Sequence, residues 1–221
     1  MRKKCALILL TGVMVLTLAA ASAAWADEAG NMVFFRGGWA GMSSDRSKEL
    51  LTSSDQLLFP NAANDGGSGH YVGAGLDLVL SKDVWGMMNK TWALGEIGVE
   101  YKRLGSKHVC QPSFVAVGLG CNPAVVQITM LTVDIAPKIK FMEGSRLRPW
   151  IIPIGLDFHV ISPPSNDITY LDIGIQFGAG VEYRLYKAFH LGLDGRFHLA
   201  SGATDTTNNF GTVGAYLGIA F

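Results

Sequence analysis

From residue 31 to the C-terminus, apolar side chains alternate with polar or small ones. This period of two is typical of β-strands whose two faces meet different surroundings. The segment 171–185 is the clearest case, because every odd position is apolar and every even position is polar or glycine. The same pattern predicts eight strands, at 31–42, 70–80, 92–102, 126–142, 148–160, 170–185, 190–200 and 211–221.

The connections between these predicted strands alternate in length. The connections 43–69 and 103–125 are long, whereas Glu143-Gly144-Ser145 and Tyr186-Lys187-Ala188 form tight turns. An even number of strands, with long loops at one side and short turns at the other, is typical of outer-membrane barrels. The predicted fold is all-β, an eight-stranded antiparallel up-and-down transmembrane β-barrel.

The polar face of the strands distinguishes a barrel from a soluble sandwich. The core of a sandwich could not hold this many charges, whereas the lumen of a barrel allows acids and bases to pair. His159, His198, Lys102 and Lys140 share this face with the charged positions. The predicted lumen network consists of Arg36, Asp77, Glu96, Glu100, Asp134, Lys138, Asp157, Asp172, Glu182, Arg184, Asp194 and Arg196.

Aromatic residues and prolines refine the prediction. Two aromatic girdles are expected of a barrel in a membrane. One would contain Trp92, Phe141, Trp150, Tyr183, Tyr186 and Phe221, and the other Trp39, Tyr101, Phe158, Tyr170 and Phe197. Pro137 and Pro153 lack the N–H that a strand interior uses, so we expect a bulge or an irregular stretch shared by their two strands. The apolar connection 81–91 is expected to form a short interfacial helix.

The N-terminus carries the features of a secretory signal peptide. Arg2, Lys3 and Lys4 precede an apolar run at 6–21, and Ala24-Trp25-Ala26 provides a small-residue cleavage pattern. We therefore expect a signal peptide at 1–26 and an outer-membrane barrel domain at 27–221. The N-terminus of the mature chain would be periplasmic and the long loops extracellular.

Composition and cysteine content exclude several other classes. A hydrophobic fraction of 49% and a charged fraction of 16% exclude a disordered chain, and 18 acids balance 18 bases without a basic block that could bind nucleic acid. Once Cys5 leaves with the signal peptide, Cys110 and Cys121 form an even pair in an oxidising compartment, which predicts a disulfide. Two thiols with only His108 nearby do not complete a zinc site, so no metal or cofactor is expected.

The signal peptide, the eight alternating strands and the terminal sequence Gly218-Ile219-Ala220-Phe221 resemble the small, porin-like barrel proteins of the Gram-negative outer membrane. This resemblance implies that Phe221 belongs to the segment recognised by the barrel-assembly machinery. We expect contacts with outer-membrane lipid and lipopolysaccharide, and a monomer.

Two functions without catalysis agree with this fold. Eight strands enclose an interior that side chains just fill, so the first is an envelope protein with a filled, polar lumen and loops that serve interaction or envelope integrity. Glycines on the lumen face, such as Gly98 and Gly174, could admit long side chains or leave a cavity. The alternative is a narrow channel or lateral conduit for small hydrophobic molecules.

The C-terminal part also resembles the outer-membrane lipid A deacylases, in the segments 148–150, 176–183, 195–201 and 208–211. In that family a His and a Ser two residues later cleave an ester-linked acyl chain, with a downstream acid. The resemblance implies His198 as the base and Ser201 as the nucleophile. Here the spacing is three residues, Ala200 occupies the expected serine position, and Asp205 is the only later acid. These departures favour a protein without catalytic residues, with the acyl-ester hydrolase as the alternative.

Overall fold

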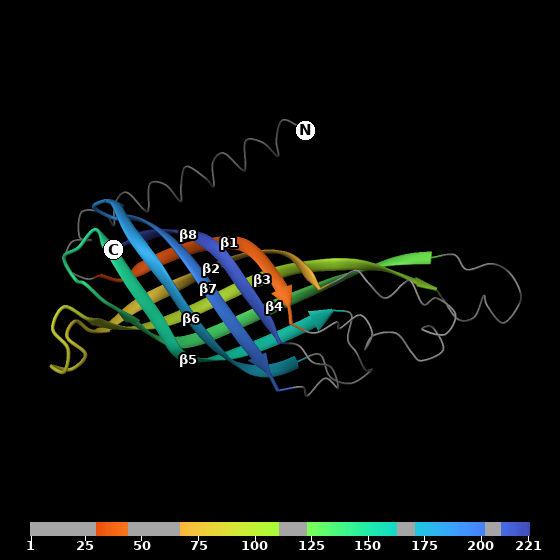
Figure 1. Cartoon of the computed structure of the whole chain (residues 1–221), viewed down its shortest axis with the longest axis horizontal. Helices are drawn as coiled ribbons and strands as arrows, with labels where there is room; N and C mark the ends of the chain where they lie inside the picture. The colour runs from red at the N-terminus through yellow and green to blue at the C-terminus, as the bar shows by residue number, and fades with distance from the viewer. Residues whose placement is uncertain (1–29, 44–66, 111–122, 163–170, 202–208) are drawn as a thin grey trace, which may run out of the picture.

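The protein forms one closed β-barrel. A computed structural model describes residues 30–43, 67–110, 123–162, 171–201 and 209–221. The strands are β1 (Met32–Met42), β2 (Ser68–Ser81), β3 (Trp92–Cys110), β4 (Pro123–Lys140), β5 (Leu147–Ser162), β6 (Leu171–Tyr186), β7 (Phe189–Ala200) and β8 (Phe210–Ala220). Each pairs antiparallel with its neighbours in sequence, and β1 pairs with β8 to close the sheet (Figure 1). The predicted fold class, strand number and strand order are confirmed.

The barrel has two ends, which we name by the strands that meet there. At the terminal mouth β1 begins and β8 ends, and at the distal mouth β1 ends and β8 begins. The strands β3 and β4 project furthest at the distal mouth (Figure 1). The third predicted strand ended at residue 102, but pairing resumes after a register shift between Arg103 and Ser106 and continues to Cys110 and Pro123. The predicted loop 103–125 is correspondingly shorter.

Alternation places apolar side chains outside and charges inside. Val72 and Leu80 on β2 are 58% and 57% exposed, and Val213 on β8 is 62% exposed. Glu96, Glu100 and Asp157, which face the lumen, are fully buried. An apolar exterior around a charged interior is the reverse of a soluble protein, and hydrocarbon is the solvent that this surface suits. The chain is therefore a membrane-spanning barrel.

The aromatic prediction is wrong for Trp92 and Trp150. Trp92 lines the lumen opening at the terminal mouth together with Lys140 and Glu182. Trp39, Phe158 and Phe197 are exposed near the distal mouth, and Tyr186 is exposed at the terminal mouth, as expected of girdle residues. Trp150 instead lies in the lumen, where it is 1% exposed and its Nε1 donates a hydrogen bond to the hydroxyl of Tyr216 at 3.0 Å. The alternation of β5 puts position 150 on the lumen face, and this overrides the preference of tryptophan for an interface.

The connection between β2 and β3 does not form the expected interfacial helix. Residues 84–87 and 89–90 form turns, with positive φ angles at Val84, Trp85 and Lys90 of 50°, 55° and 60°. Left-handed residues interrupt a right-handed helix, because their backbone cannot continue its hydrogen-bond pattern. The described part of the chain contains no helix of the length and hydropathy needed to cross a membrane.

The barrel wall is irregular where the two strand prolines meet. Pairing between β4 and β5 stops after Ile135 and Leu156 and resumes at Ile139 and Ile151. Between β5 and β6 the register shifts between Ile152 and Gly155. Pro137 and Pro153 lie in the break between β4 and β5, and Pro153 lies in the break between β5 and β6; both prolines lack the N–H group that a regular ladder uses. The predicted irregular stretch shared by the two strands is confirmed.

Three predictions fall on residues that lie outside the described ranges. The signal peptide at 1–26 lies in the undescribed segment 1–29, and Cys121 of the predicted disulfide lies in the segment 111–122. Tyr170 of the distal girdle also lies outside the described residues. These assignments stay predictions.

Candidate functional site

The centre of the lumen is occupied by a cluster of ion pairs, which we call the central ion network. Arg36 on β1 places Nη1 at 3.2 Å from Glu96 Oε1, Nε at 2.7 Å from Glu100 Oε1, and Nη2 at 2.8 Å from Asp134 Oδ1. All four side chains are at most 1% exposed. A single guanidinium group therefore joins β1 to β3 and β4 through the interior.

A second guanidinium group crosses the lumen from the other side. Arg196 on β7 places Nη1 at 2.5 Å from Glu96 Oε1 and Nε at 3.0 Å from Asp194 Oδ2. The strands β3 and β7 are opposite each other in the closed order of eight, so the pair of Glu96 and Arg196 spans the barrel. Ion-paired side chains therefore extend across the centre of the lumen.

Lumen glycine makes room for this network. A Cβ atom on Gly98 would lie 2.5 Å from Asp134 Oδ1 and 2.8 Å from Arg36 Nη2, closer than non-bonded atoms approach. The ion pair of Arg36 and Asp134 thus occupies the space that a side chain at position 98 would need. At this position a glycine therefore admits the long side chain of Arg36.

Towards the terminal mouth the network continues through two lysines. Lys138 Nζ lies 2.9 Å from both Asp77 Oδ2 and Glu96 Oε2, which joins β4 to β2 and β3. Lys140 Nζ lies 2.9 Å from Glu182 Oε2, which also accepts a hydrogen bond from the Tyr216 hydroxyl at 3.1 Å. Through Glu182, these contacts link β4 to β6 and β8.

Of the twelve residues predicted for the lumen network, all but Arg184 are buried. Arg184 is exposed and lines a small hollow at the terminal mouth, with Lys187 and His190 among its neighbours there. Position 184 lies two residues from the end of β6, where the lumen opens to solvent and alternation no longer implies burial. Tyr71, Trp150 and Tyr216 were not predicted as network members. The alternation along their strands nevertheless places Tyr71 and Tyr216 on the lumen face. Their hydroxyl and indole groups contact Asp194, Tyr216 and Glu182.

Towards the distal mouth two histidines meet one carboxylate. His198 Nδ1 lies 2.7 Å from Asp157 Oδ2, and His159 Nε2 lies 3.8 Å from the same oxygen. The aromatic ring of Phe210 stacks on His198 at a centroid distance of 4.2 Å. All three polar side chains are 0% exposed. We call Asp157, His159 and His198 the histidine cluster.

The two residues of the hydrolase alternative have different partners. His198 bonds to Asp157, a residue 41 positions upstream, whereas the hydroxyl of Ser201 donates to Asp172 Oδ1. The acid that contacts His198 is therefore Asp157, which lies upstream of the histidine and not downstream as the resemblance implied. The separation along the chain hid it, because β5 and β7 come together only through β6.

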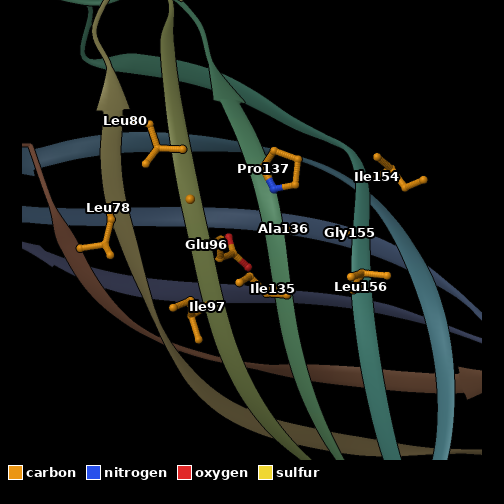
Figure 2. A pocket seen from close by; sticks show the side chains of 11 residues that line it. Leu78, Leu80, Glu96, Ile97, Ile135, Ala136, Pro137, Ile154, Gly155 and Leu156 are labelled. Atoms are coloured by element: carbon orange, nitrogen blue, oxygen red, sulfur yellow. The ribbon is translucent and has the colours of Figure 1, made fainter.

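An apolar groove lies on the outer wall, over the irregular stretch of β4 and β5. It has a volume of about 610 Å³ and we call it the wall groove. Figure 2 shows Leu78 and Leu80 on one side and Ile154 and Leu156 on the other, with Pro137 between them. Glu96 also lines it, so the groove reaches the strand whose carboxylate holds the central ion network. The full lining is Leu78, Leu80, Gly95, Glu96, Ile97, Ile135, Ala136, Pro137, Ile154, Gly155 and Leu156.

No protein-family model matches this sequence, and no curated protein is similar to it. Similar solved structures include Neisserial surface protein A, with 14% identity, 87% of this chain and 97% of that chain covered, and a TM-score of 0.49. The outer-membrane enzyme PagL has 12% identity, coverage of 86% and 99%, and a TM-score of 0.45. The N-terminal β-barrel domain of Pseudomonas aeruginosa OprF has 14% identity, coverage of 87% and 98%, and a TM-score of 0.45. At these identities the likeness concerns the fold alone.

Proposed function

We propose that this chain is a non-enzymatic, integral outer-membrane protein of the Gram-negative envelope, whose lumen is closed by ion-paired side chains. The observation that carries the proposal is the contact of Glu96 with Arg36, Lys138 and Arg196, three cations from different parts of the wall. Side chains that fill an eight-stranded barrel leave no aqueous path for solutes. The protein then acts through its surface and its connections, not through transport along its axis.

The location and orientation rest on sequence features beside the fold. The predicted signal peptide and the terminal Phe221 support export followed by insertion through the barrel-assembly machinery. With a periplasmic N-terminus, the connections 43–67 and 110–123 would meet the cell exterior, where lipopolysaccharide and other external partners are available. We propose a monomer, because closure of the barrel satisfies every strand edge.

Conductance in planar lipid bilayers tests the closed lumen. The purified protein is expected to give no stable unitary currents in symmetric salt of about 1 M, where the Debye length is only about 3 Å and charge repulsion does not exclude ions. A general diffusion porin in the same bilayers shows that insertion and recording work. Reproducible single-channel steps from this chain would overturn the proposal.

Lipid A mass spectra test the absence of enzymatic activity. Cells that express the wild type, a His198→Ala variant or neither protein are expected to have identical lipid A, because His198 bonds to Asp157 while Ser201 bonds to Asp172. Loss of one acyl chain with the wild type only would establish the hydrolase instead. A known deacylase in the same cells serves as the positive control.

The wall groove supports a second candidate, a lateral site for a hydrophobic molecule. Its lining consists mainly of leucine, isoleucine and proline side chains at the depth of the spanning strands, which suits a lipid acyl chain. On the lumen side of this site, Glu96 forms ion pairs with Lys138 and Arg196, which lie between the groove and the axis of the barrel. The candidate is therefore binding at the wall rather than passage through the barrel.

Filling the groove tests this second candidate. Gly95→Leu places a side chain in the groove, and a Cβ there meets only Leu80 atoms at 3.7 Å or more, so the backbone tolerates it. Ala215→Leu is the matched control, since Ala215 is exposed on the outer face of β8 and does not line the groove. Binding of a fluorescent fatty acid to the detergent-solubilised barrel is expected to fall for Gly95→Leu and to stay unchanged for Ala215→Leu. Equal binding by both variants and the wild type contradicts the candidate.

A further inference from the structure

The histidine cluster brings three metal-ligating side chains together. Asp157 and His159 come from β5 and His198 from β7, and one ligand atom from each lies within 4.8 Å of the others. Donor atoms that bind one tetrahedral ion at about 2.0–2.1 Å lie roughly 3.4 Å apart. The distances from Asp157 Oδ2, 2.7 Å to His198 Nδ1 and 3.8 Å to His159 Nε2, lie on either side of that value. Small side-chain rotations would bring the three donors around a common point.

Each member of the cluster also retains a polar atom without a hydrogen-bond partner among the described residues. These atoms are Asp157 Oδ1, His159 Nε2 and His198 Nε2. The three side chains are 0% exposed, so bulk water does not reach them. Buried polar groups in native proteins are nearly always satisfied, and an exception calls for a bound water or ion. Three exceptions in one cluster point to a bound water or ion there, and His159 Nε2 is the one of these atoms that the donor distances above also include.

The charge balance of the lumen favours a cation at this position. Among the described residues, eight buried acids face six buried bases, an excess of two negative charges. The acids are Asp77, Glu96, Glu100, Asp134, Asp157, Asp172, Glu182 and Asp194, and the bases are Arg36, Lys102, Lys138, Lys140, Arg148 and Arg196. The nearest lysine, Lys102, pairs with Glu100, while the ion-pair partners of Asp157 are the two histidines. A buried carboxylate without a strong cation is unfavourable, and a divalent ion would balance it.

Neighbouring side chains hold the two imidazole rings in place. In metal sites, groups that contact the ligands fix the orientation of those ligands in the same way. Thr132 Oγ1 lies 3.1 Å from His159 Nδ1, and it accepts a hydrogen bond from Lys102 Nζ at 2.8 Å. A hydroxyl oxygen can accept a second hydrogen bond, from His159 Nδ1–H, which leaves the Nε2 lone pair available to a metal. Phe210 holds the ring of His198 by stacking at an interplanar angle of 13°.

The strand between the ligands leaves space for the ring of His159. Gly174 on β6 is the register partner of Asp157, and a Cβ there would lie 3.2 Å from His159 Nε2. Because Gly174 has no side chain, the region beside that nitrogen is not filled by the intervening strand.

From these observations we propose that Asp157, His159 and His198 bind one divalent transition-metal ion inside the barrel, with zinc as the reference ion. Two imidazoles and one carboxylate suit zinc and its neighbours, and three protein ligands leave a position open for water or another small ligand. Calcium and magnesium, which prefer sets of oxygen ligands, are disfavoured. The metal would tie β5 to β7 across β6.

Metal content of the untagged, full-length mature protein tests this site. One sample is stripped with a chelator and dialysed against Zn²⁺, and a second is refolded into detergent with Zn²⁺ present, so that burial of the site cannot prevent loading. We expect one zinc per chain by elemental mass spectrometry in the refolded sample. Substitution of Co²⁺ should add a visible absorption band that reports direct coordination by the ligands.

Variants separate the cluster from other histidines. The double variant His159→Ala/His198→Ala is expected to lose at least about 100-fold in zinc affinity, since even changes outside the ligand shell cost 10–100-fold. His190→Ala is the matched control, because His190 lies on the same strand but bonds to Glu182 at the terminal mouth. Circular dichroism and gel mobility confirm that each variant is folded. Zinc below about a tenth of an equivalent in both wild-type samples, or full uptake by the folded double variant, would overturn the site.

Discussion

Glu96 is the residue on which closure of the lumen depends most. Its two carboxylate oxygens contact Arg36, Lys138 and Arg196, which come from β1, β4 and β7. Burial of so many charges is unfavourable unless each charge has partners of opposite sign. The removal of one partner leaves the remaining charges buried without compensation, which destabilises the fold. The network therefore behaves as a unit, and single substitutions within it have large effects.

Substitution of Arg196 measures this dependence. Arg196→Ala leaves Glu96 and Asp194 buried with fewer partners, so the free energy of unfolding is expected to fall by about 3–5 kcal/mol. Arg184→Ala, which changes an exposed arginine, is expected to alter it by less than about 0.5 kcal/mol. Equilibrium unfolding by guanidinium chloride in lipid vesicles checks both values. Equal stability of the two variants would mean that the central network contributes little.

Residue positions were predictable where alternation alone decides burial. A period of two assigned Arg36, Glu96 and Asp134 to one face, and the closed sheet turned that face inward. The prediction failed for Arg184, near the end of its strand, and for Trp150, where residue type was weighed above position. The partners of each charge could not be predicted, because they come from strands far apart in sequence.

At the scale of elements, the wall is weakest where β4, β5 and β6 lose their regular pairing. The irregularity was predicted from Pro137 and Pro153, because proline has no N–H to donate. The wall groove over the break was not predictable, since its lining comes from four strands. Its depth depends on side-chain positions that only the closed sheet defines.

Amide hydrogen exchange tests the break. The amides of Ile152, Ile154 and Gly155 lie in the irregular stretch, and they are expected to exchange faster than those of Phe158 and Val160, which lie in regular pairing on both sides. Exchange followed by NMR or mass spectrometry on the folded barrel in detergent gives the comparison. Equal protection along β5 would show that the irregular stretch is as closed as the rest of the strand.

The connection between β3 and β4 carries the predicted disulfide. Labelling of the mature, unreduced protein with a thiol reagent is expected to modify neither Cys110 nor Cys121, and labelling after reduction should modify both. The cross-link closes a short loop, so its reduction is expected to lower stability by about 3 kcal/mol. Reaction of either cysteine before reduction would contradict the pairing.

At the scale of the whole molecule, closure joins the first and last strands. The pairing of β1 with β8 runs from Met32 opposite Ala220 to Met42 opposite Phe210, and the amide of Phe221 donates to Asn31 O at 2.9 Å. A closed sheet leaves no edge in the hydrocarbon, and this makes the fold stable there. Unheated samples are expected to migrate differently from boiled samples on a denaturing gel.

The final aromatic residue is expected to act in assembly rather than in stability. Phe221→Ala should lower the amount of folded barrel in the outer membrane severalfold, while refolding into detergent in vitro stays unchanged. Phe189→Ala, at an exposed aromatic position near the same mouth, is the control and should assemble normally. A loss of refolding in vitro as large as the loss in cells would assign Phe221 a structural role instead.

The amino-acid sequence by itself determined the class of the fold, the number of strands and the face that most side chains occupy. These properties follow from local periodicity, which each strand carries within itself. Only the tertiary structure decided which residues of different strands meet inside the lumen: Glu96 with Arg196, Lys140 with Glu182, and Asp157 with His198. The physical reason is that closure of the sheet fixes distances between strands that are far apart along the chain. The central ion network, the wall groove and the histidine cluster therefore arise from closure, although every residue in them was visible beforehand.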